Sequence, residues 1–323
     1  MDSLREVTDA HRLIAFTGKG GVGKTSASAA TAVELADRGE RTLLLSTDRS
    51  PSLSDVLDTD VYGEVTSVPD VDGLEAIELD YDAVARRWKK RYGEDVYAVV
   101  SSFMPVDRWV IDYFAEAPGI ATQFALSFLL EFFEAETYDR IVWDTAPAGA
   151  TIGLIELEEK LYGHLGDAPK FYAKLRAALK RDVAADPAEL LEEWRDLAQD
   201  CLAMVRSPQS TFVVVTNPES LAVRETGRIT EELNRREIDV GAVIANSVLE
   251  RSVCDCEYHE ERIEMQAEHL RSLAEAYAES PGLLVVPQLR TEVAGLSSIR
   301  SVGEVLFDPD AEPLDGEPGD HSR

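Results

Sequence analysis

The sequence contains little cysteine and no long apolar run. Its three cysteines, Cys201, Cys254 and Cys256, cannot form a paired disulfide framework, which agrees with a reducing interior. No stretch approaches the ~18 uninterrupted apolar residues of a membrane-spanning helix. The first residues, MDSLREVTDAHRL, are polar and acidic, unlike a secretory signal or an arginine-rich transit peptide. We therefore expect a cytoplasmic protein.

Basic side chains are also scarce. There are 32 lysines and arginines against 61 aspartates and glutamates, which gives a formal net charge of -29 at pH 7. Proteins that bind nucleic acids need a basic patch to neutralise phosphates, so we expect no nucleic-acid partner. Because the acidic residues are spread along the whole chain, we interpret the charge as adaptation to a salt-rich cytoplasm such as that of a haloarchaeon.

Short apolar segments rich in β-branched residues recur along the chain and alternate with helix-like segments. Such apolar segments suit strands that are buried on both faces. Their alternation with helices predicts an α/β fold with a mainly parallel sheet flanked by helices. The predicted strands are residues 12–18, 41–47, 74–80, 139–145, 211–217, 240–246 and 282–288.

Two long, helix-rich intervals break this alternation. Residues 81–138 and 151–209 are predicted to form an inserted helical subdomain, and the α/β domain comprises residues 12–80, 139–150 and 210–307. The acidic C-terminal segment, residues 308–323, is predicted to be a disordered tail. A stripe of phenylalanines at helical spacing is interpreted as core packing, with a groove for an apolar ligand or peptide helix as the alternative. The stripe consists of Phe124, Phe128, Phe132 and Phe133.

Residues 18–25, GKGGVGKT, match the phosphate-binding pattern G-x-x-x-x-G-K-[ST] between a predicted strand and a predicted helix. The glycines let backbone N–H groups wrap around phosphates, and the start of the helix adds partial positive charge. Lys24 would neutralise the β- and γ-phosphates, and the hydroxyl of Thr25 would bind Mg²⁺. The sequence therefore predicts a P-loop NTPase domain with a nucleotide and Mg²⁺ site.

The loop contains a second lysine, Lys19, and in this it resembles the deviant Walker A motif of the ArsA and guided-entry tail-anchored-protein targeting ATPases. Partitioning ATPases and the nitrogenase iron protein share this form. The resemblance implies that ATP is the nucleotide and that Lys19 of one subunit of a homodimer reaches the nucleotide of the other, as an arginine finger does. It also implies that the whole loop binds ATP: Gly18, Lys19, Gly20, Gly21, Val22, Gly23, Lys24, Thr25 and Ser26.

Two further segments resemble the switch segments of that family. STDRSPSLSDVL (46–57) places Asp48 at the position of the family's water-activating aspartate, and a turn or N-cap aspartate is the alternative. IVWDTAPAGATIGLI (141–155) resembles the second switch. Its apolar strand would deliver Asp144 to the magnesium end of the site, where the carboxylate can hold a metal-bound water. An aspartate that caps a loop is the alternative there.

Three residues resemble the family's other nucleotide contacts. Glu219 falls on a glutamate that contacts nucleotide, and a first-turn glutamate favoured by the helix dipole is the alternative. Asn246 falls on an adenine-reading asparagine, whose amide can both donate to and accept from the adenine edge. Pro287, in VPQLRTEVAGL, falls in the loop near the base.

CDCEYHEERIEMQ (254–266) resembles the family's zinc-binding Cys-x-x-Cys segment, with His259 in place of the second cysteine. Two pairs of Cys256 and His259, one from each subunit, would form a tetrahedral Cys₂His₂ site for Zn²⁺ at the dimer interface. The alternatives are Cys254 as a ligand and a segment without metal.

Together these features predict a dimeric ATPase that couples ATP binding and hydrolysis to the capture and delivery of tail-anchored membrane proteins. The helical subdomain would bind the hydrophobic transmembrane segments of these clients. One alternative is an arsenite or anion pump-driving ATPase subunit that acts with a membrane transporter or receptor, although the scattered cysteines offer few clustered thiols for a metalloid. A partitioning ATPase is a third class, disfavoured because no basic face is evident.

Overall fold

The computed structural model describes residues 3–50, 52–103, 106–115, 120–165, 187–249 and 256–308. Cys254 and residues 309–323 of the predicted tail lie outside these ranges. The chain forms two compact units. The first comprises Met1–Glu78, Glu136–Thr151 and Arg206–Arg323, and the second comprises Leu79–Ala135 and Ile152–Val205. Within the described ranges, no helix is both long enough and apolar enough to cross a membrane.

The first unit is built on a sheet with the strand order β3-β4-β2-β5-β1-β6-β7-β8 in the described part of the chain. Neighbouring strands are parallel except for β3, which runs antiparallel to β4 at one edge. The prediction of a mainly parallel α/β sheet is therefore confirmed. The strands are β1 (Leu13–Gly18), β2 (Thr42–Ser46), β3 (Thr66–Ser67), β4 (Leu74–Glu78), β5 (Arg140–Asp144), β6 (Ser210–Thr216), β7 (Val240–Val248) and β8 (Leu283–Pro287).

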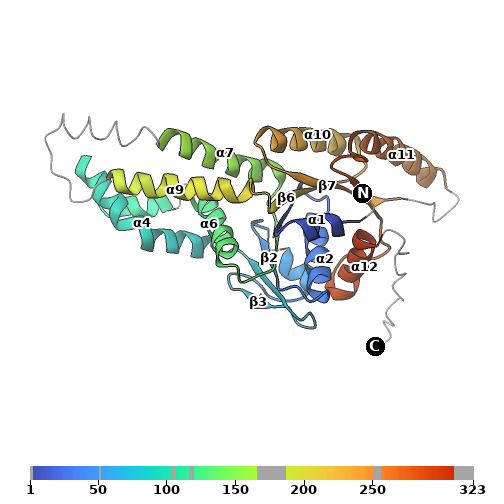
Figure 1. Cartoon of the computed structure of the whole chain (residues 1–323), viewed down its shortest axis with the longest axis horizontal. Helices are drawn as coiled ribbons and strands as arrows, with labels where there is room; N and C mark the ends of the chain where they lie inside the picture. The colour runs from blue at the N-terminus through green and yellow to red at the C-terminus, as the bar shows by residue number, and fades with distance from the viewer. Residues whose placement is uncertain are drawn as a thin grey trace. The chain divides into compact units, whose positions relative to one another are not determined.

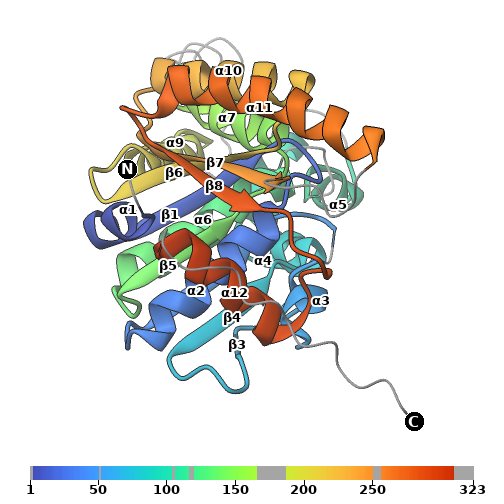
Figure 2. The ribbon, with the colours of Figure 1, turned by 90° about the vertical axis from the view of Figure 1, so that its right-hand side faces the viewer.

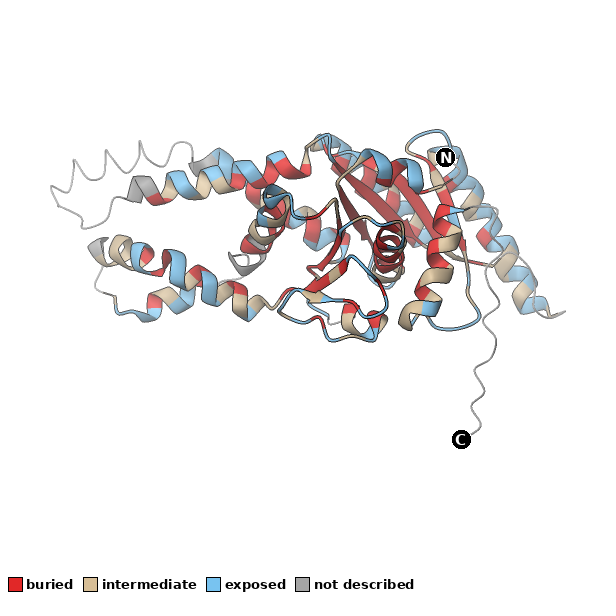
Figure 3. Cartoon of the chain, turned by 60° about the horizontal axis from the view of Figure 1, so that its bottom comes forward, coloured by how far each residue is buried: buried red, intermediate tan, exposed pale blue. Residues whose placement is uncertain are grey.

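The apolar runs form strands because this sheet is covered on both faces (Figure 3). Helices α10 (Ser220–Arg235) and α11 (Glu257–Tyr277) lie over one face, and α2 (Lys24–Asp37) and α12 (Gly295–Phe307) lie over the other (Figure 2). Every residue of β1, β2 and β6 is buried. Two shorter helices, α1 (Arg5–Ala10) and α3 (Leu53–Leu57), complete the described helices that lie wholly in this unit.

The central strands end together at one edge of the sheet, which is where loops carry the functional side chains of such folds. In the register of β1 and β5, Phe16 pairs with Asp144, and in that of β2 and β5, Ser46 pairs with Asp144. The P-loop leaves β1 at this edge, and α2 begins at its last lysine, Lys24. The strand order thus places three chain segments that are distant in sequence around one point.

The second unit is helical, and Figure 1 shows its long helices α4 and α9. It contains α4 (Tyr81–Phe103), α5 (Trp109–Ala115), α6 (Ile120–Ala135) and α9 (Pro187–Val205), and α7 (Ala148–Leu165) begins in the first unit and continues into this one. Trp88, Tyr92 and Phe124 form its buried aromatic centre, and Phe128 packs partly buried against them. Of the stripe, Phe124 therefore belongs to the buried core, and Phe128, Phe132 and Phe133 are half-buried.

Candidate functional site

The P-loop follows β1 and turns sharply into α2, and two of its positions accept only glycine. Gly18 has φ +153°, and a Cβ there would lie 2.2 Å from the carbonyl oxygen of Val215 on β6. Gly23, immediately before α2, has φ +95°, and a Cβ there would lie 2.1 Å from the amide nitrogen of Asn246. A residue with a side chain could not adopt these left-handed conformations so close to neighbouring atoms, so both positions require glycine.

The two lysines of the loop have different surroundings. Lys24 is 6% exposed, and its Nζ donates to the backbone carbonyl of Lys19 at 3.4 Å. This ammonium thus lies along the loop that is expected to bind phosphates. The side chain of Lys19 is exposed. In the part of the chain that the structure describes, its ammonium makes no hydrogen bond or ion pair.

Hydroxyl groups surround the carboxylate of Asp144 at the end of β5. Thr25 Oγ1 donates to Asp144 Oδ2 at 3.0 Å, and Ser46 Oγ donates to the same oxygen at 3.1 Å. Asp144 is fully buried, and its other oxygen, Oδ1, is buried without a hydrogen-bond partner. A carboxylate oxygen in that state beside a threonine hydroxyl is a donor set that suits Mg²⁺ and its bound water.

Burial raises the pKa of Asp144 to about 6 because it disfavours the charged form. The hydrogen bond from Thr25, the positive charge of Lys24 and the hydrogen bond from Ser46 act in the opposite direction, and the negative charge of Asp48 acts with burial. A divalent cation would supply the positive charge that this buried carboxylate lacks.

Asp48 lies two residues after the end of β2 and is half-buried. Its backbone N–H donates to Ser46 Oγ at 3.3 Å, and its Oδ1 accepts from the backbone N–H of Ser50 at 3.1 Å. In this conformation the carboxylate closes a turn with Ser50. The same contacts tie Asp48 through Ser46 to Asp144.

Two serines that no sequence motif singled out, Ser46 and Ser52, also belong to this site. Ser46 bonds to both aspartates described above, and Ser52 Oγ lies 3.4 Å from Thr25 Oγ1. Ser46 was detectable in principle, because it is the last residue of an apolar strand at the carboxyl edge of a parallel sheet. Ser52 gives no comparable signal, since its place depends on how the loop after β2 folds back.

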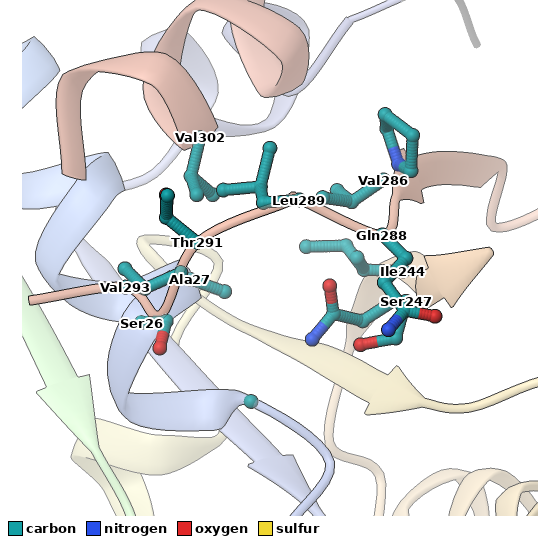
Figure 4. A pocket seen from close by; sticks show the side chains of 13 residues that line it. Ser26, Ala27, Ile244, Ser247, Val286, Gln288, Leu289, Thr291, Val293 and Val302 are labelled. Atoms are coloured by element: carbon teal, nitrogen blue, oxygen red, sulfur yellow. The ribbon is translucent and has the colours of Figure 1, made fainter. Parts of the chain in front are cut away.

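A cavity of about 220 Å³ adjoins the loop (Figure 4). Gly23 and Ser26 bound it on the P-loop side, and Asn246 and the segment that begins at Pro287 bound it elsewhere. Figure 4 shows Gln288, Leu289 and Thr291 along this segment. Its volume is below the roughly 300–1,000 Å³ of pockets for whole ligands, so it suits one part of a nucleotide, such as the base.

Glu219 is not among the residues that line this cavity. It occupies the N-cap position of α10, makes no side-chain capping bond, and its Oε1 lies 3.8 Å from an Arg262 guanidinium nitrogen. Asn246, in contrast, lies at the cavity wall, and its Nδ2 donates to the backbone carbonyl of Val22 at 2.8 Å. The structure thus brings Asn246 and Pro287 to the loop and leaves Glu219 outside the cavity.

The predicted metal pair lies at the start of α11. Cys256 is the N-cap residue, and its Sγ lies 3.1 Å from His259 Nδ1. Among the described residues, no group of three or more His, Cys, Asp or Glu side chains is placed to hold a metal ion. The described part of the chain therefore offers the two predicted side chains here, half of what a tetrahedral zinc site needs.

Comparison with known proteins places these features in a family context. Residues 11–308 match the family of anion-transporting ATPases. A Halobacterium salinarum protein named "Putative arsenical pump-driving ATPase" is 31% identical over 301 residues, which cover 93% of this chain but only 44% of that protein. ATPase GET3B of Arabidopsis thaliana is 30% identical over 321 residues, which cover 90% of this chain and 77% of that protein. A second protein named as an arsenical pump-driving ATPase, from Aquifex aeolicus, is 32% identical over 302 residues, which cover 91% of this chain and 99% of that protein.

Proposed function

The chain belongs to the anion-transporting ATPase family, and from this premise we propose that it is a dimeric ATPase that captures tail-anchored membrane proteins and delivers them to a membrane. The observation that carries the proposal is the contrast between the two P-loop lysines. Lys24 is buried along its own loop, whereas Lys19 is exposed. A cation that its own subunit does not hold is available to a second subunit, where it would stabilise charge on the transferring phosphoryl group.

Within one subunit, the other roles in ATP hydrolysis would fall to Lys24, Thr25, Asp144 and Asp48. The Lys24 ammonium would neutralise the β- and γ-phosphates, and the Thr25 hydroxyl and the Asp144 carboxylate would hold Mg²⁺ and its water. Mg²⁺, when bound, neutralises charge that develops on the phosphate oxygens. Asp48 would orient the attacking water, after its carboxylate leaves the turn that it now closes with Ser50.

We place client binding on the helical unit, residues 79–135 and 152–205. Two aromatic side chains of α5 support this: Trp109 is 56% exposed and Tyr113 is 66% exposed, and their rings pack edge to face. Large apolar side chains that remain in water on an otherwise acidic protein are typical of a binding surface. A hydrophobic transmembrane segment is an occupant that would remove them from water.

We further propose that Cys256 and His259 bind Zn²⁺ together with the same pair of a second subunit. The two side chains already lie within 3.1 Å of each other, and thiolate and imidazole are preferred zinc ligands. Zinc bound in this way would stabilise the dimer and not the single subunit, because each subunit supplies only half of the ligands.

A subunit-mixing experiment tests the shared site. Lys19→Ala and Asp48→Asn homodimers should each hydrolyse ATP about a hundredfold more slowly than the wild type, since each lacks one positioned catalytic group. In a mixed dimer, the Lys19→Ala subunit keeps Asp48 and receives Lys19 from its partner, so one of the two sites is complete. Random exchange of equal amounts should therefore restore about a quarter of the wild-type rate if the sites act independently. Verified exchange without recovery would contradict the proposal.

A second experiment separates client delivery from pump driving. The Asp48→Asn variant, which should hold ATP without hydrolysing it, is co-expressed with a test protein that ends in a single C-terminal transmembrane segment. We expect the two to co-purify with ATP, and a polar scrambled segment should not bind. The alternative, a pump-driving subunit, is favoured by the names of two of the relatives described above. It predicts instead that arsenite or antimonite stimulates ATP turnover of the wild type.

A further inference from the structure

The side-chain amide of Asn246 makes a contact that reading adenine does not require. Asn246 lies on β7, and its Nδ2 donates to the main-chain carbonyl of Val22, 224 residues earlier in the chain, at 2.8 Å. Val22 is inside the P-loop, and its own side chain is 4% exposed. The contact therefore joins the wall of the base cavity directly to the loop that is expected to bind phosphates.

The same amide also packs against the next residue of the loop. Gly23 has φ +95°, and a Cβ on it would lie 2.1 Å from Asn246 Nδ2. The amide thus occupies the space that a side chain at Gly23 would need. Both Gly23 and Asn246 line the cavity of about 220 Å³, so the amide stands where the cavity meets the loop.

The Val22–Gly23 peptide needs a restraint of this kind. Glycine tolerates many φ and ψ values, so the plane of a peptide group next to glycine can flip at low cost by rotation about the adjacent single bonds. A phosphate loop works only while its N–H groups point toward the phosphates. Rotation of this peptide would turn the Gly23 N–H away and bring the Val22 carbonyl oxygen toward the bound anion. A donor fixed on the carbonyl prevents that rotation.

We propose that Asn246 is a positioning residue for phosphate binding, in addition to its expected contact with the base. Its amide nitrogen holds the Val22 carbonyl and so keeps the loop in its phosphate-binding conformation, while its amide oxygen is left to accept a hydrogen bond from the base. This inference rests on the proposed nucleotide site. It means that one side chain orders both ends of that site.

Inorganic tripolyphosphate separates the two roles because it has phosphates and no base. Its dissociation constant, and that of ATP, are measured by isothermal titration with Mg²⁺ for the wild type, Asn246→Ala and Asn246→Ser. The serine hydroxyl is too short to reach Val22, so both variants should behave alike. We expect tripolyphosphate to bind about fivefold more weakly to either variant, the effect of losing one neutral hydrogen bond. The fitted stoichiometry shows whether a change reflects weaker binding or loss of folded protein.

Gln288→Ala is the matched control, because Gln288 lines the same cavity and, among the described residues, its side chain makes no hydrogen bond to the P-loop. Its tripolyphosphate affinity should stay within about twofold of the wild type. Asn246 variants that lose affinity for ATP but bind tripolyphosphate as the wild type does would overturn the inference and leave the proposed function standing. A wild type that binds ATP but no tripolyphosphate would overturn it too, and a wild type that binds neither would overturn the proposed function with it.

Discussion

Glu78 is the residue whose replacement should most clearly expose how the first switch segment is held. It is the last residue of β4 and is 2% exposed. Its Oε1 accepts from the N–H of Leu53 at 2.7 Å, and its Oε2 accepts from the N–H of Ser54 at 3.2 Å and from the Ser54 hydroxyl at 2.6 Å. These donors open α3, which forms the last part of the switch segment 46–57 that also contains Asp48, so Glu78 anchors the far end of that segment.

The Glu78→Gln substitution keeps the size of the side chain but leaves one acceptor oxygen where there were two. The new NH₂ group must face a backbone N–H, so at least one buried donor loses its partner, at a cost of about 1–3 kcal/mol. The Ser54 hydroxyl offers little relief, since its oxygen already accepts from the N–H of Val61 at 3.2 Å. The remaining bonds lose their charge assistance. We therefore expect the free energy of unfolding to fall by about 3 kcal/mol.

Glu75→Gln, three residues earlier on the same strand, is the control. Its carboxylate accepts one side-chain bond, from the Tyr138 hydroxyl at 2.5 Å, and an amide oxygen can replace it, so the loss should stay below about 1 kcal/mol. Urea unfolding followed by circular dichroism compares both variants with the wild type. Equal losses for the two variants would refute the reasoning from the number of accepted bonds. ATP turnover should also fall in Glu78→Gln, because Asp48 would lose its fixed position.

Three further predictions concern the nucleotide site and the proposed zinc site. Lys24→Ala should abolish nucleotide binding, whereas Asp48→Asn should still bind nucleotide but no longer hydrolyse it. Isothermal titration measures the binding and phosphate release measures the hydrolysis. An Asp48→Asn variant that hydrolyses ATP at the wild-type rate would contradict the role of Asp48 in orienting water. Because the pKa of Asp144 is raised to about 6, its contribution to stability without metal or nucleotide is present at pH 4 and lost as the pH rises through 6. The unfolding free energy of the wild type relative to Asp144→Asn should thus fall by about 2 kcal/mol from pH 4 to 7, and a constant difference would be incompatible with a raised pKa. Elemental analysis should find zinc in protein purified without chelators and none in Cys256→Ala, with chelation shifting the wild type toward monomer; zinc-free wild type would refute the zinc site.

The sequence alone was sufficient for the features that depend on local chemistry. Strands buried on both faces must be continuously apolar, so the runs that became β1, β2 and β6 were visible as such. The phosphate loop was visible because its glycines, Lys24 and Thr25 all lie within residues 18–25, so their spacing can be read directly from the sequence. The resemblance to a family rested on the same kind of local signal.

Only the tertiary structure decided which distant residues meet. Ser46 contacts Asp144 because β2 and β5 are neighbours in a register that pairs these two residues. Asn246 reaches the Val22 carbonyl because β7 ends beside the loop that follows β1. Strand order and register arise from how all the elements pack together, and the periodicity of a single strand contains no information about its neighbours. For that reason the sequence predicted which kind of site lies at this edge of the sheet, and the fold determined which side chains position the predicted site residues.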